Sequence, residues 1–543
     1  MKILREYYMN RKYIYALTAL TFFALTGCVK LDTLPEGDTV TSSQKEDVLS
    51  KDPSKAIAGV NAIFAQFSQY EPNYSALGNR ARHNDIGFPS IMFFTDANGL
   101  DLVSKVTGYN WMQADLNYSD RDFSSLNCQI VWNDLYSIIY TTNSVVGAIS
   151  AETEDPTSQF YLAQGLATRA FSYWILAQLY QFDYAGHKTS PCVPIITNEN
   201  SNQAALSGAP RATVDEVYTL INSDINKAID LLKSAQDGGI TRADKRYISL
   251  AVAYGLRARI NLTMEKWAEA AADATSAINA SEATPASISD VSKPYFWDIS
   301  EGDWMWGIII SETDDVVSSG IVNWISHMGS LNYGYANYSG GMKINKALYN
   351  SIPATDVRKG WWLDANRLSA NITTADEKEW MDYYYGAYTQ VKFAPYQNIV
   401  GNSINANDIP LMRIEEMYLI KAEAEAMSGA DGKTTLENFV KQYRDPSYVC
   451  TVTAAADVQK EVLHQRRIEL WGEGLSWFDI MRLKTGVDRR GGGFPNATMV
   501  FNIAPNADIL LWRIPEKEMQ ANPGLKAEDN NPAAPVPTPV PDI

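Results

Sequence analysis

Apolar residues recur every three or four positions over several long stretches of the chain, and this spacing predicts amphipathic helices. The first stretch covers residues 52–69, where an Asp-Pro pair suits the start of a helix. Four more helices are predicted over residues 131–149, 161–180, 214–232 and 246–262. We therefore expect a mostly helical protein with only a few short strands.

The best-defined local unit lies between residues 251 and 280. Ala251, Ala258 and Leu262 belong to one apolar face, a short turn follows, and Trp267, Ala270 and Ala274 begin a second face. Small alanines let two antiparallel helices approach closely, and the pattern resembles one tetratricopeptide repeat. A degenerate copy follows at 411–427 and 436–443. The pattern predicts a repeat-like helical scaffold over roughly 52–280 and 408–525.

In two long stretches, 79–127 and 295–401, apolar residues do not recur at a regular spacing. Both stretches are rich in Gly, Asn, Asp, Ser and aromatic residues. This composition predicts long irregular loops inserted in the scaffold, and such loops often carry binding sites. Trp304 and Trp306 are an exception, because their strand-like alternation assigns them to the core. The Pro-rich tail, 530–543, is expected to be disordered or polyproline-like.

The first residues have the order of a bacterial lipoprotein signal. Basic residues precede an apolar run over 13–25, and the run ends in the sequence Leu25, Thr26, Gly27, Cys28. The run is shorter than the about 20 residues that a membrane-spanning helix needs. We expect cleavage of residues 1–27 as a signal peptide and lipidation of the Cys28 thiol, which would anchor the mature chain without a transmembrane segment.

Charge and chemistry exclude several functions. The net charge of −17 disfavours nucleic acid as a partner, because phosphate binding needs a basic surface. The remaining cysteines and the four histidines lack metal-ligand spacing, so no metal site, no disulfide framework and no cofactor are predicted. No phosphate-binding loop or nucleophile elbow occurs, and we assign no catalytic residue.

Several segments, in order along the chain, resemble the SusD/RagB family of outer-membrane nutrient-binding lipoproteins. After the lipidation box, residues 169–180 resemble a family helix that begins Arg-Ala-Phe, and Asp356–Arg358 is similar to a family Asp-x-Arg helix end. The segments 408–424 and 466–482 carry the strongest resemblance, and Ile514-Pro515 completes the series. Val391 departs from the family pattern, which has aromatic residues there more often.

The resemblance implies one SusD-like domain over residues 28–529, anchored by lipid in the outer membrane and facing the cell exterior. It also implies a partner, a TonB-dependent outer-membrane transporter of the SusC type, over whose barrel the lipoprotein acts as a lid. The charged residues of 413–423 and 466–473 alternate in sign at helical spacings. This alternation independently predicts ion pairs between packed helices.

The loop composition favours an oligosaccharide as the ligand, since flat sugar faces need aromatic platforms with polar groups at their edges. The candidate ligand-binding residues are Asn110, Trp111, Trp324, Asn332, Tyr333, Tyr335 and Asn337. We expect Trp111, Trp324, Tyr333 and Tyr335 to face solvent together as one platform. Three alternatives stay open: a peptide-binding lipoprotein of the RagB type, a surface hydrolase, and a structural interaction module.

Overall fold

The computed structural model describes residue 48 and residues 52–70, 85–105, 112–318, 323–334 and 340–543. Backbone contacts divide the chain into two units, Met1–Lys55 and Ala56–Ile543, and the second unit holds the fold described below. Among the described residues, no helix combines the length and the apolar character that crossing a bilayer requires.

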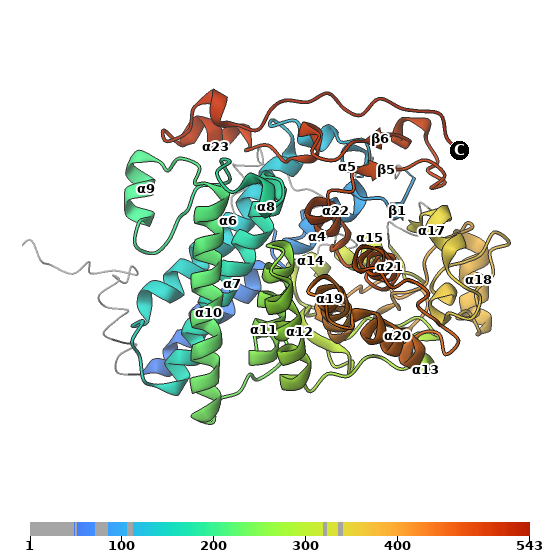
Figure 1. The fold of residues 1–543 in the computed structure, drawn as a ribbon, viewed down its shortest axis with the longest axis horizontal. Coiled ribbons are helices and arrows are strands. Elements are labelled where there is room, and N and C mark those ends of the chain that lie inside the picture. Colours follow the sequence, from blue (N-terminus) through green and yellow to red (C-terminus); the bar gives the residue numbers. More distant parts are fainter. Residues whose placement is uncertain (1–47, 49–51, 71–84, 106–111, 319–322, 335–339) are drawn as a thin grey trace, which may run out of the picture. The chain divides into compact units, whose positions relative to one another are not determined.

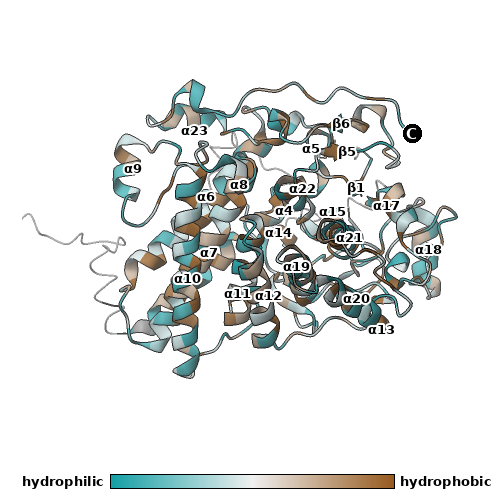
Figure 2. Ribbon diagram, viewed as in Figure 1, coloured by the Kyte–Doolittle hydropathy of each residue, from teal (hydrophilic) through white to brown (hydrophobic). Residues whose placement is uncertain are grey.

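Three long helices pack together in the first half of the second unit: α6 (Leu126–Ala148), α7 (Pro156–Tyr180) and α10 (Val214–Asp237) (Figure 1). Helix α10 begins with a capping box between Thr213 and Glu216, and hydrophilic and hydrophobic residues alternate along it, as expected for a helix with one buried face (Figure 2). Arg169 of α7 donates hydrogen bonds of 2.7 and 2.8 Å to the carboxylate of Asp224 and so ties α7 to α10.

The predicted tetratricopeptide-like pair is present. Helices α11 (Leu250–Thr263) and α12 (Trp267–Ala280) pack on each other, and α12 packs on α19 (Ile414–Met427). The degenerate copy follows as α19 and α20 (Gly432–Tyr443), with α21 (Ala455–Glu469) against α19. Helix α22 (Ser476–Leu483) completes this group. The prediction of a mostly helical, repeat-like scaffold is confirmed.

Three antiparallel pairs of short strands occur in the described chain: β1 (Leu102–Val103) with β3 (Lys343–Ile344), β2 (Trp304–Ile308) with β4 (Ile409–Arg413), and β5 (Val487–Asp488) with β6 (Asn502–Ile503). Trp304 and Trp306 of β2 are fully buried, which confirms their assignment to the core. Gly255 of α11 permits a close approach to β4, because a Cβ atom there would lie 2.5 Å from Met412 Sδ.

The remaining elements are short and connect or cover this frame. The helices are α3 (Ile57–Gln66), α5 (Gln113–Leu116), α8 (Tyr184–His187), α9 (Ser201–Ser207), α13 (Ile288–Val291), α14 (Asp315–Ser318), α15 (Trp324–Met328), α17 (Lys346–Ser351), α18 (Ala375–Tyr384) and α23 (Glu516–Ala521). Seven 3-10 turns, Pro53–Ala56, Ser119–Arg121, Val357–Trp361, Tyr396–Asn398, Ala497–Met499, Asp508–Leu510 and Ala527–Asp529, complete the described elements.

The prediction of a long loop over 79–127 is wrong for its middle part. Residues Phe88–Asn98 form helix α4, and all eleven of them are buried. A helix that is covered on every side needs no polar face, so its sequence shows no helical period. Within 295–401, by contrast, the described residues form only short elements, which agrees with the prediction of an irregular insertion.

The C-terminal tail lies along the body of the second unit without helix or strand, past β5 and β6 (Figure 1). The Asn531 side-chain amide donates hydrogen bonds to the carbonyl oxygens of Tyr180 and Trp512, 2.9 and 2.7 Å away, and the Val540 amide donates to the Val500 carbonyl at 2.9 Å. These bonds hold the tail in place, so of the two expectations, a disordered or a polyproline-like tail, the structure contradicts the first.

Candidate ligand-binding site

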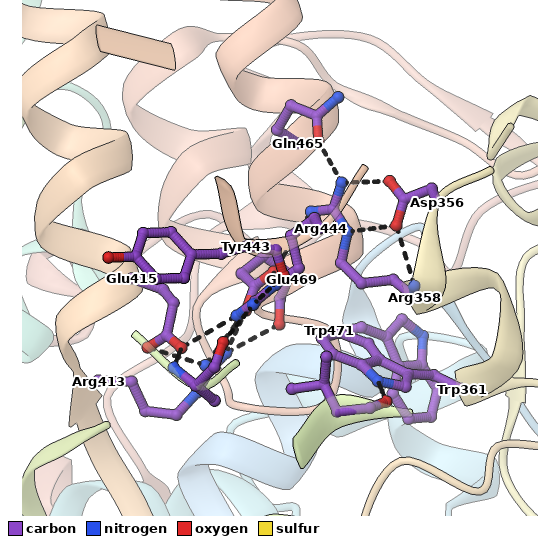
Figure 3. A network of polar contacts seen from close by, with 12 residues as sticks. Asp356, Arg358, Trp361, Arg413, Glu415, Tyr443, Arg444, Gln465, Glu469 and Trp471 are labelled. Atoms are coloured by element: carbon purple, nitrogen blue, oxygen red, sulfur yellow. Dashed lines mark hydrogen bonds and ion pairs between the residues drawn. The ribbon is translucent and has the colours of Figure 1, made fainter. Parts of the chain in front are cut away.

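A buried network of charged side chains joins the segments with the strongest family resemblance (Figure 3). Arg413, at the end of β4, donates to Glu473 at 2.9 and 3.0 Å and to Glu469 at 3.2 Å. Arg444 donates to Glu469 at 2.8 Å and to Glu415 at 2.9 Å. Solvent reaches at most 4% of any of these side chains. The predicted ion pairs between packed helices are confirmed for these residues.

The arginines of this network hold Glu469 in the ionised state, whereas burial raises the pKa of Glu415. Burial would raise the pKa of Glu469, but the charges of Arg444, Arg413 and Arg358 outweigh it and hold that pKa well below its usual range. Burial also lowers the pKa of Lys392 to about 8, although its ammonium group donates to Glu473 at 2.6 Å. Because no ligand can reach these groups, we assign the network to the stability of the scaffold.

Five of the residues singled out from the sequence, Cys28, Asn110, Trp111, Tyr335 and Asn337, lie outside the described residues. The structure therefore places only Trp324, Asn332 and Tyr333 of that set.

Trp324 does not face solvent, and the expectation that it does is wrong. It is the first residue of α15, only 1% of its surface is exposed, and its ring stands edge-on to Phe393 with the ring centroids 5.1 Å apart. The Asn323 side chain caps α15 by accepting the Ser326 amide at 3.0 Å. A helix of five residues is too short for apolar residues to recur at helical spacing. For this reason the sequence around Trp324 resembled a loop.

Asn332 is also fully buried, so it is not a surface contact for a ligand. Its side-chain amide donates to the Asn405 side-chain oxygen at 2.7 Å and to the Ile325 carbonyl at 3.1 Å. Asn405 in turn donates to the Tyr333 carbonyl at 2.8 Å. The two buried asparagines therefore fix the backbone on which Tyr333 stands.

Tyr333 is exposed over 38% of its surface, which agrees with the expected exposure of this ring. The Tyr333 amide donates to the Asn402 carbonyl at 2.9 Å. On the segment that contains Asn402, Ile399 and Ile404 are also exposed, and neither was singled out from the sequence. We call Tyr333, Ile399, Asn402 and Ile404 the Tyr333 strip. In the sequence, Ile399 and Ile404 are isolated aliphatic residues within an asparagine-rich segment, and this was the only sign that they could be exposed.

Three segments border a cleft of about 570 Å³. They are helix α3 with the residues that follow it, strand β2, and residues 313–315. The apolar lining of the cleft includes Phe64, Phe67 and Trp306, which are almost completely buried, and the half-buried Tyr70. Its polar lining includes Asn61, Ser68, Gln69, Arg246, Asp314 and Asp315. These residues are far apart in the sequence, so sequence reasoning could not bring them together.

The described residues contain no group of three His, Cys, Asp or Glu side chains placed to hold a metal ion. Cys128, Cys192 and Cys450 are buried and unpaired. Burial raises the pKa of Cys128 to about 12, so its thiol stays protonated and is a poor nucleophile at neutral pH.

Comparison with known families identifies both halves of the chain. The sequence profile of the SusD family matches residues 333–533, and a second SusD-like profile, described as starch-binding and associating with the outer membrane, matches residues 93–262. The chain belongs to the SusD/RagB family. The Tyr333 strip lies inside the SusD-matched range, whereas α3, β2 and residues 313–315 of the cleft lie outside both ranges.

One related protein supports the same family, and solved structures show the same fold. SusD-like protein P2 of Formosa agariphila is 25% identical over 434 residues, which cover 74% of this chain and 79% of that protein. A SusD-like carbohydrate-binding protein from Bacteroides vulgatus has a TM-score of 0.70 at 22% identity, over 88% of this chain and 97% of that one. A laminarin-binding SusD-like protein has a TM-score of 0.61 at 17% identity, over 89% and 99%.

Proposed function

We propose that this SusD-like protein captures an oligosaccharide at the cell surface and passes it to a TonB-dependent outer-membrane transporter of the SusC type, without catalysing a reaction. Two structural relatives, described as carbohydrate-binding and laminarin-binding, support a sugar as the ligand. The observation that carries the proposal is the exposed Tyr333 ring, whose backbone is held by the buried pair Asn332 and Asn405.

The chemistry of the Tyr333 strip suits a sugar. An exposed ring can stack on the flat apolar face of a pyranose, which contributes on the order of 1 kcal/mol beyond the buried area. The exposed Ser403 beside it offers a hydroxyl to the edge of the sugar, whereas the Asn402 side chain is bonded to the Tyr396 carbonyl and the Ile404 amide. Because Asn332 and Asn405 hold the backbone before a ligand arrives, binding needs little ordering of this segment.

Binding measurements on a panel of soluble glycans test the proposal. Laminarin, starch, xylan and mannan fragments are titrated into the wild type, Tyr333→Ala and Tyr140→Ala. Tyr140 of α6 is 71% exposed and serves as the matched control. We expect one glycan to bind the wild type and the control equally and Tyr333→Ala at least about fivefold more weakly, roughly the loss of one stacking contact. A wild type that binds no glycan contradicts the proposal.

The same experiment tests the absence of catalysis. After long incubation of the bound glycan with the protein, chromatography should show the glycan unchanged. Shorter products formed by the pure protein would revive the surface hydrolase.

Delivery to a transporter requires a complex in the outer membrane, a location that agrees with the description of the matched family. We expect the native lipoprotein, extracted with mild detergent, to copurify with a TonB-dependent transporter. Purification of the native protein without any such partner would contradict this part of the proposal.

The cleft favours a second candidate, a peptide-binding protein of the RagB type. Its lining includes many polar side chains, and of its aromatic residues Phe64, Phe67 and Trp306 are buried and only Tyr70 is half-buried, so the cleft offers no broad stacking shelf. If a peptide is the ligand, Gln69→Trp, which puts a bulky ring at an exposed lining position, should abolish binding of a peptide library. Tyr333→Ala should leave that binding unchanged.

A further inference from the structure

We propose that helix α18 carries a second sugar-binding surface, adjoining the Tyr333 strip, which binds further units of a long, neutral oligosaccharide. The proposal rests on the proposed function and defines the class of ligand more narrowly. It is carried by Trp380, Tyr383 and Tyr384, which we call the α18 aromatic surface.

One side of α18 is anchored in the core, and of the α18 aromatic surface Trp380 and Tyr384 pack in part against the same buried cluster, whereas Tyr383 does not. Thr374 and Glu377 form a capping box at the start of the helix. Met381 and Tyr385 then enter a buried cluster with Leu331, Leu363, Ile372 and Val391. The helix is therefore held at its start and along its inner side.

The three rings of the α18 aromatic surface form a continuous group. The ring centroids of Trp380 and Tyr384 are 4.5 Å apart with a tilt of 41°, and those of Tyr383 and Tyr384 are also 4.5 Å apart, nearly perpendicular at 68°. Tyr383 is 79% exposed, so its ring contributes little to the core. Trp380 and Tyr384 are half-buried, so the group presents one exposed ring beside two partly exposed ones, and such an aromatic patch is typical of a surface that binds a ligand or partner.

Gly401 connects the α18 aromatic surface to the Tyr333 strip. Its φ is +78°, and a Cβ atom there would lie 2.9 Å from Trp380 Cζ3, so the indole lies directly against the Gly401 backbone. The Gly401 amide donates to the Leu331 carbonyl at 2.7 Å, and the next residue, Asn402, accepts the Tyr333 amide at 2.9 Å. Trp380 and Tyr333 therefore flank the same turn of chain, and one extended ligand can contact both.

Charge on α18 indicates which glycans fit. Its sequence, Ala-Asp-Glu-Lys-Glu-Trp-Met-Asp-Tyr-Tyr, holds four acidic residues and a single lysine. Asp382 is 70% exposed and pairs with Arg367 at 3.3 Å, so its carboxylate can accept hydrogen bonds from sugar hydroxyls at the edge of the rings. An anionic glycan, rich in uronic acid or sulfate, would be repelled here, whereas a neutral glycan would not.

The test is a series of neutral oligosaccharides of increasing length, from disaccharide to heptasaccharide, derived from the glycan that the panel selects. Each is titrated into the wild type, Tyr383→Ala, Tyr333→Ala and the control Tyr140→Ala, with melting curves alongside. We expect the wild-type affinity to rise with length. We expect Tyr383→Ala to bind the heptasaccharide several-fold more weakly than the wild type does. It should bind the shortest oligosaccharide that the wild type binds with wild-type affinity, and its melting temperature should be unchanged.

The outcomes separate this inference from the proposed function. If the wild type binds glycans and Tyr383→Ala binds every length as the wild type does, the α18 aromatic surface is not part of the site and the inference is overturned. An equal loss at every length also overturns it, because the ring would then belong to the primary site. If an oligogalacturonide of equal length binds as tightly as the neutral chain, the preference for neutral glycans is wrong. A wild type that binds no glycan overturns the proposed function itself.

Discussion

Arg444 donates two hydrogen bonds of 2.8 Å to the two carboxylate oxygens of Glu469, and neither side chain is reached by solvent. Arg444 follows the last residue of α20, and Glu469 is the last residue of α21. Arg413 of β4 contacts the same carboxylate. One buried glutamate thus joins the ends of three elements, and removing one of its partners would leave an uncompensated charge in the core.

We therefore expect Arg444→Ala to lower the free energy of unfolding by about 3–5 kcal/mol, the usual range for breaking a buried ion pair. The matched control is Arg490→Ala, because Arg490 makes a similar two-bonded contact with Asp488 at the surface. Water screens that exposed pair, so Arg490→Ala should leave the urea midpoint nearly unchanged. Urea denaturation of both variants provides the comparison, and equal losses would contradict the role assigned to the buried network.

The burial of Trp324 predicts a loss of stability when its ring is removed. Trp324→Ala should lower the free energy of unfolding by about 3–5 kcal/mol, as for other large aromatic residues in cores, and Trp324→Phe by less. Tyr333→Ala, on an exposed ring of the same segment, should change it by about 0.5 kcal/mol or less. A Trp324→Ala variant with an unchanged melting temperature would show that the ring is not part of the core.

Asp96 predicts a pH dependence of stability. Its carboxylate accepts the Gly474 amide at 2.9 Å, and burial raises its pKa to about 7. The folded protein keeps this proton up to about pH 7, whereas the unfolded chain loses it near the usual value of 3.8. Its contribution to stability is therefore fully present below about pH 4 and is lost as the pH rises to about 7.

Asp96→Asn removes this titration, since an amide can still accept from Gly474 and donate to the Ser476 hydroxyl. We expect the melting temperature of the variant, relative to the wild type, to rise between pH 4 and 7 and to level off above pH 7. Melting curves at five pH values decide this. A difference that is the same at every pH would mean that Asp96 titrates normally.

The lipidation of Cys28 is predicted from the sequence alone. Mass spectrometry of the native protein should find Cys28 as an acylated N-terminus, and Cys28→Ser should shift the protein out of the outer-membrane fraction, because the several acyl chains that hold it are gone. An unmodified Cys28, or a cleavage site elsewhere, would contradict the prediction.

The sequence by itself determined the features that depend on neighbouring residues along the chain. In helices α6, α7, α10, α11 and α12 apolar residues recur every three to four positions, and this local period is visible without knowledge of the fold. The alternating charges around Arg413 and Glu469 likewise predicted ion pairs. The resemblance of the same segments to the SusD/RagB family was sufficient to identify the family.

Only the tertiary structure decided which side chains are covered. Helix α4 is buried on every side because other elements surround it, and Trp324 is buried because the short helix α15 packs its ring against Phe393. Trp380 contacts Gly401, 21 positions further along the chain. Asn405 supports Tyr333, which lies 72 positions before it. Exposure depends on where distant segments return in space, and no local pattern of residue types contains that information.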